Sequence, residues 1–86
     1  MWWRQRFATL RGELRALQDG VAQKQVRLVE LRRERRIFTR ARDREAVNLL
    51  ADEISSDEVR INQVMNRIAE LEQEATRAAV PMEWRR

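Results

Sequence analysis

Apolar residues recur along this chain at alternating intervals of four and three, and this spacing constrains the fold more than any other feature. A heptad series sustained for about five repeats predicts a coiled-coil helix. The first series is Trp3, Phe7, Leu10, Leu14, Leu17, Val21, Leu28, Leu31 and Phe38, with Lys24 and Arg35 at two further seam positions. The second is Val47, Leu50, Ile54, Asp57, Ile61, Val64, Ile68, Leu71, Ala75 and Ala78.

The two series are out of phase with each other. Phe38 and Val47 are nine residues apart, an interval that no continuous heptad accommodates. The chain is therefore expected to turn within 39–43, with Asp43 as the N-cap of the second helix. Helices of about 2–38 and 44–79 would each be ~55 Å long. The sequence thus predicts a single all-α domain, an antiparallel two-helix coiled-coil hairpin.

A pairing of the two halves follows from this model. If facing residues have numbers that sum to 85, each a position meets a d position, for example in Phe7/Ala78 and Leu14/Leu71. Lys24 and Asp57 then lie one turn apart on opposite helices and are placed to form an ion pair across the seam. Such a pair adds little stability but fixes register.

The second helix has an alternative interpretation. Ser55-Ser56-Asp57-Glu58 contains a capping box, the usual mark of a helix start, and would divide the helix at that point. However, Ile54 and Ile61 are one heptad apart, so the seam keeps its phase across the site. We therefore favour a continuous helix that ends before Pro81, followed by a non-helical tail at 80–86.

Composition excludes several function classes. The sequence contains no cysteine and no histidine, so disulfides and thiolate or imidazole metal sites are excluded. No nucleophile, base and orienting group can be assembled, and we expect no catalytic residue, cofactor, metal or small-molecule substrate. Arg15, Arg32 and the Arg44-Glu45 pair are similar to the anion-binding arginines of all-α chorismate mutases only as isolated residues. The interval from Arg32 to Arg44 is too short, and no family is assigned.

Some apolar residues fall outside both seams. A chain this small usually needs association when disulfides and metals are excluded. We expect these residues to pack against another chain, giving a four-helix bundle or a larger helical assembly. They are Val26, Val29, Ile37, Leu49, Val59 and Met65.

Arginines gather around the predicted turn. Residues 32–44 hold seven arginines against Glu34 and Asp43, a net charge of +5, whereas the whole chain carries +4. The cluster is either a nucleic-acid phosphate contact or a solvated helix end whose cations favour the helix dipole. The candidates for nucleic-acid or anion binding are Arg32, Arg33, Arg36, Arg40, Arg42 and Arg44.

Three tryptophans, Trp2, Trp3 and Trp84, are expected to meet at the open end of the hairpin. They would form an aromatic cap, a docking site for a larger partner, or an anchor in a bilayer interface. The heptad pattern favours protein contact over a membrane, and no apolar run is long enough to span one. The function that the sequence favours is a non-enzymatic, cytoplasmic structural or adaptor coiled coil that acts through homo-oligomerisation or protein–protein interaction. The first alternative is a nucleic-acid-binding hairpin that uses the arginine-rich turn, and the least favoured is a small all-α, arginine-rich enzyme.

Overall fold

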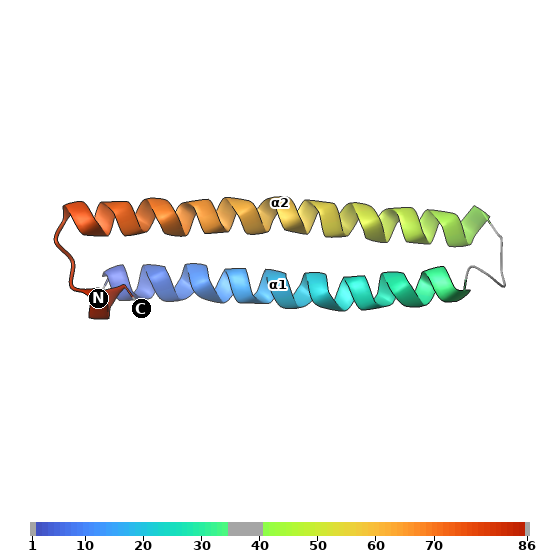
Figure 1. Cartoon of the computed structure of the whole chain (residues 1–86), viewed down its shortest axis with the longest axis horizontal. Coiled ribbons are helices and arrows are strands. Elements are labelled where there is room, and N and C mark those ends of the chain that lie inside the picture. Colours follow the sequence, from blue (N-terminus) through green and yellow to red (C-terminus); the bar gives the residue numbers. More distant parts are fainter. Residues whose placement is uncertain (1, 35–40, 86) are drawn as a thin grey trace.

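Two antiparallel helices make up almost the whole molecule (Figure 1). The structure is a computed structural model that describes residues 2–34 and 41–85. Helix α1 spans Trp2–Glu34, helix α2 spans Ala41–Arg77, and a short 3₁₀ helix, η1, spans Met82–Trp84. They form a rod of 59 × 16 × 14 Å with both termini at one end. The predicted all-α hairpin is confirmed, and the described residues contain no strand.

The helix boundaries differ from those predicted. Helix α2 begins at Ala41, so Asp43 lies inside its first turn instead of ahead of it as an N-cap. The helix then continues without interruption through Ser55 and Ser56, which confirms the continuous interpretation. Helix α1 ends with Arg32 and Arg33 in its last turn, where cations interact favourably with the helix dipole. The predicted helical residues 35–38 lie outside the described part of the chain.

A backbone motif ends α2 two residues before the predicted position. The Val80 N–H donates to the Ala75 carbonyl at 2.9 Å, and the Ala79 N–H donates to the Thr76 carbonyl at 3.1 Å. This is a Schellman motif, and Ala79 takes the left-handed conformation it requires, with a φ of 53°. As a result Ala78, predicted to lie in the seam, is exposed, and Val80 is buried instead.

The pairing of the helices is shifted by one heptad from the prediction. Arg60 Nε donates to Glu13 Oε1 at 3.0 Å. In the predicted pairing, Arg60 and Glu13 would be twelve residues apart along the axis, or ~18 Å. Arg11 and Glu72 also line one groove, on the other edge of the seam. Together these contacts put Phe7 level with Leu71 and Leu14 level with Val64.

The sequence pattern could not distinguish the two registers. A shift of seven residues matches a positions to d positions equally well, because the heptad repeats itself. The start of α2 at Ala41, ahead of the predicted residue 44, and its early end at Arg77 accompany the shifted register. The predicted pairing is therefore wrong in its register but right in its alternation of a and d layers.

The core is densest at the end of the rod that holds the termini. Phe7, Leu71 and Ala75 are almost completely buried there, and Trp3, Leu14, Leu17, Ile68 and Trp84 pack against them. Towards the turn, Val47 and Ile54 are buried, but Leu28, Leu31 and Leu50 remain partly exposed. Among the residues whose burial is described, the half of the hairpin near the turn thus contributes fewer fully buried side chains.

Candidate functional site

One ion pair lies in the middle of the seam. Lys24 Nζ donates to Asp57 Oδ2 at 2.6 Å and lies 4.0 Å from Glu53 Oε2. The hydrogen bond to Asp57 raises the pKa of the Lys24 ammonium above its ordinary value of 10.5, and the nearby negative charges of Asp57 and Glu53 act in the same direction. The predicted pairing of Lys24 with Asp57 is confirmed. Because Lys24 belongs to α1 and Asp57 to α2, the pair links the two helices across the seam.

The three tryptophans lie at the end of the rod that holds the termini, as expected. Trp3 and Trp84 pack against the core cluster, where they cover its last layer. The rings of Trp2 and Trp3 meet edge to face, with centroids 4.7 Å apart, and Trp2 remains 59% exposed. Trp3 and Trp84 therefore serve the fold as a cap, and Trp2 is the tryptophan that presents the most free surface.

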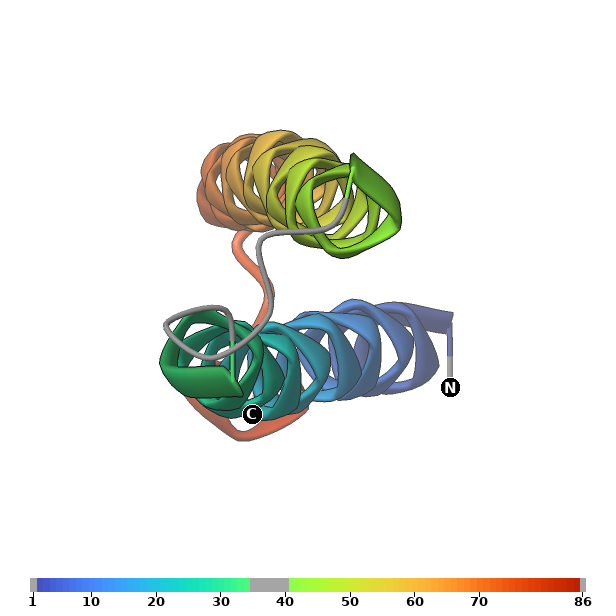
Figure 2. The ribbon, with the colours of Figure 1, turned by 90° about the vertical axis from the view of Figure 1, so that its right-hand side faces the viewer.

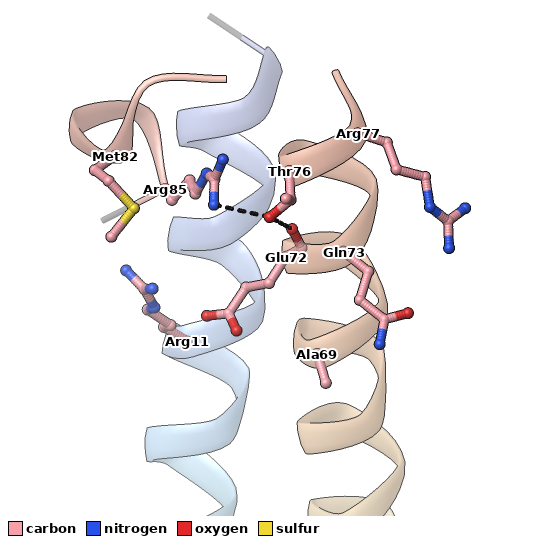
Figure 3. A pocket seen from close by; sticks show the side chains of 8 residues that line it. All are labelled: Arg11, Ala69, Glu72, Gln73, Thr76, Arg77, Met82 and Arg85. Atoms are coloured by element: carbon pink, nitrogen blue, oxygen red, sulfur yellow. Dashed lines mark hydrogen bonds between the residues drawn. The ribbon is translucent and has the colours of Figure 1, made fainter. Parts of the chain in front are cut away.

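A groove of about 650 Å³ lies beside this cap, between the two helices and the tail (Figure 3). Arg85 donates from Nη2 to the Val80 carbonyl at 2.8 Å and from Nη1 to Thr76 Oγ1 at 3.1 Å, and so ties the tail to α2. Arg11 lies over the Phe7 ring, 5.4 Å from its centroid. Figure 3 shows Arg77 pointing away from the groove. The groove was not predicted from the sequence, because the tail 80–86 was expected to be non-helical, whereas Met82–Trp84 form η1, and no contact was expected for Arg85.

The groove has mixed chemistry. Two cations, Arg11 and Arg85, line the groove together with the Glu72 carboxylate. Ala69 on α2 and Met82 on the tail add apolar surface to it. Arg85 already uses three of its donors within the protein. The charged side chains that line the groove therefore carry more positive than negative charge.

The apolar residues outside the seams are exposed, and the structure divides them between the two helices. Val26, Val29, Leu49, Val59 and Met65 are each between 49% and 63% exposed. The sixth member of the set, Ile37, lies outside the described residues. Val26 and Val29 belong to α1, whereas Leu49, Val59 and Met65 belong to α2, so the set does not lie on one helix.

Three arginines of the predicted cluster lie within the described residues, at the turn end of the hairpin. Arg32 and Arg33 are exposed in the last turn of α1, and Arg44 is exposed in the first turn of α2 (Figure 1). Arg36 and Arg40 lie outside the described residues, as does the side chain of Arg42. The antiparallel fold thus brings the two parts of the cluster to one end of the rod.

An acidic stretch of α2 begins directly after Arg44, next to the arginines at the turn end. Between residues 45 and 58 the sequence contains five acidic residues and no basic one, and all five belong to α2. They are Glu45, Asp52, Glu53, Asp57 and Glu58. No partner-binding role was predicted for this run from the sequence. The hairpin therefore carries opposite charges on neighbouring segments.

No group of three potential metal-ligating side chains comes together within 2–34 and 41–85. None of the helices in those ranges has the length and apolar character needed to cross a bilayer.

Comparison with known proteins found no relative: no protein-family model matches the chain, and no curated protein or solved structure resembles it significantly.

Proposed function

We propose that this hairpin is a non-enzymatic structural or adaptor protein that works by helix-on-helix association, with a second copy of itself as the partner. The observation that carries the proposal is the exposure of Val26, Val29, Leu49 and Val59 on the half of the rod near the turn. These four aliphatic side chains, two on each helix, expose more apolar surface than hydrophobic residues scattered singly over a surface would.

Energetics support association. Complete burial of an aliphatic side chain contributes about 1.5–3 kcal/mol, and each of these four side chains is roughly half exposed in the single chain. A hairpin two helices thick has little interior, and the sequence has no cysteine to reinforce it. Covering the outer residues would therefore stabilise the fold as well as join the copies. The proposal includes a cytoplasmic location, which the absence of cysteine favours.

Light scattering across a range of chain concentrations tests the proposal. The wild-type molar mass should exceed the single-chain value of 10.4 kDa and rise with concentration. The variant V26Q/L49Q should return to the single-chain mass while retaining its helix content. Ala8→Gln, an exposed substitution on α1 far from the turn, is the matched control and should leave the mass unchanged. A wild-type chain with single-chain mass at every concentration would overturn the proposal.

Nucleic-acid binding is the second candidate, and one observation favours it: Arg32, Arg33 and Arg44 are exposed at the same end of the rod. Phosphate contacts of this kind weaken steeply as salt rises. Absence of binding to duplex and single-stranded nucleic acid at low salt would reject this candidate.

A further inference from the structure

The outer side of α1 near the turn is apolar and basic. Ala22, Val26, Val29 and Arg33 follow one another at intervals of four, three and four, which places them on one face of the helix. All four are exposed, and the face they form lies away from the seam. We call these four residues the α1 stripe.

The outer side of α2 is apolar and acidic. Glu45, Leu49, Asp52, Ser56 and Val59 follow the same alternating intervals and are all exposed. We call these five residues the α2 stripe. The end-on view shows the two helices side by side, so their outer sides face in opposite directions (Figure 2).

The register makes the two stripes complementary. The pairing that puts Phe7 level with Leu71 also puts Val29 level with Leu49 and Arg33 level with Glu45. When a second hairpin is placed beside the first in the same orientation, its α2 stripe lies antiparallel to the first hairpin's α1 stripe. Val29 then meets Leu49, and the Arg33 guanidinium meets the Glu45 carboxylate. One apolar contact and one contact between opposite charges therefore form in the same interface, and neither hairpin has to change its conformation.

A two-fold arrangement uses these surfaces less well. Two α1 stripes packed together would leave both α2 stripes uncovered. Two α2 stripes packed together would bring the acidic residues of one copy, including Asp52, close to those of the other, and like charges at an interface disfavour association. Pairing α1 with α2 instead uses one stripe of each kind, with Val29 against Leu49 and Arg33 against Glu45.

We infer that copies of this chain assemble side by side, with the α1 stripe of each hairpin packed against the α2 stripe of the next. The inference rests on the proposed self-association and specifies its geometry. Such an interface is heterologous: each copy keeps one free stripe, so the assembly extends into a row unless it closes into a ring.

Two blocked variants test this geometry. V26Q/V29Q disables the α1 stripe, and L49Q/V59Q disables the α2 stripe. Each variant alone should have the single-chain mass, because it retains only one kind of stripe. An equimolar mixture should form a complex of one copy of each variant, with twice the single-chain mass of 10.4 kDa and no growth beyond it. Circular dichroism checks that both variants keep the wild-type helix content.

A charge exchange tests the predicted contact between Arg33 and Glu45. R33E and E45R should each raise the concentration needed for assembly by about tenfold, which corresponds to ~1.4 kcal/mol. The double variant R33E/E45R should restore assembly. Because the two side chains lie on opposite outer sides of one hairpin, restoration must come from contact between copies.

The outcomes separate this inference from the proposed function. A wild-type chain that never associates overturns both. A wild-type chain that associates, while L49Q/V59Q alone still forms dimers, overturns only the inference, because dimers of that variant would show that α1 stripes pair with each other.

Discussion

Ala79 has the one positive φ among the described non-glycine residues, and this conformation ends α2. Its Cβ is strained in the left-handed region, where glycine is the usual residue. The conformation is maintained because it lets Val80 be buried and lets the Ala75 and Thr76 carbonyls accept hydrogen bonds. The strained backbone of Ala79 therefore lowers the free energy of unfolding that this helix end contributes.

Replacing Ala79 with glycine should relieve that cost. We expect A79G to raise the free energy of unfolding by roughly 0.5–1 kcal/mol, since the lost strain exceeds the added backbone entropy of the unfolded chain. Urea unfolding monitored by circular dichroism measures the change. The neighbouring substitution A78G should lower stability, because Ala78 has no positive φ to relieve. A decrease in A79G would contradict the assigned motif.

Lys24 is the only lysine, and the sequence has no tyrosine, cysteine or histidine. A pH-dependent change in stability around the lysine pKa can therefore be assigned to the Lys24 side chain. The ion pair with Asp57 raises the pKa of Lys24 in the folded chain above 10.5. Folding therefore favours the protonated ammonium. The stabilisation is fully present below pH 10.5 and is lost as the pH rises through the raised pKa.

The wild-type free energy of unfolding should accordingly fall across that alkaline window. Lys24→Arg keeps a positive charge at these pH values and should show a much smaller fall. Lys24→Met should be flat in the same window and less stable than wild type at neutral pH. Chemical denaturation at a series of pH values provides the comparison. Parallel decreases in wild type and Lys24→Arg would show that the ion pair is not responsible.

At the level of whole helices, the contacts that determine register are few. The seam itself repeats every seven residues, and the Lys24–Asp57 pair is within reach in both registers, whereas the Arg60–Glu13 contact forms in the observed register alone. Both pairs remain partly exposed to solvent, and ion pairs of this kind contribute little to stability. The end layer also distinguishes the registers, because Val80 and Trp84 pack beside Phe7 and Trp3 only when α2 ends level with the start of α1.

Engineered cysteines can measure the register directly, since the natural chain has none. In the observed register Leu14 is level with Val64, so L14C/V64C should form an intramolecular disulfide on oxidation. L14C/L71C should not, because those residues are one heptad out of level, or ~10 Å along the axis. Electrophoretic mobility with and without reductant reads out the result. The opposite pattern would restore the register predicted from the sequence.

For the molecule as a whole, core and charge are unevenly distributed along the rod. The end that holds the termini is closed by Phe7, Leu71 and the tryptophan cap, and the half near the turn has, among the residues whose burial is described, fewer fully buried side chains and holds the exposed valines. The arginines at the turn end and the acidic stretch of α2 lie in that same half. The proposed row of hairpins would use this half for contact and leave the capped end of each copy free.

The heptad spacing and its phase break were sufficient to predict two antiparallel helices, a continuous α2 and the Lys24–Asp57 pair, because periodicity determines which faces are apolar and where the chain must turn. The exposure of Val26, Leu49 and Val59 followed from the same spacing. Only the tertiary structure decided the register, the end of α2 at Arg77 with the burial of Val80, and the contacts of Arg85. A repeating pattern has the same a and d matches after a shift of seven residues. Choosing between registers therefore depended on contacts that do not repeat, which form only when the tail and both helices pack together.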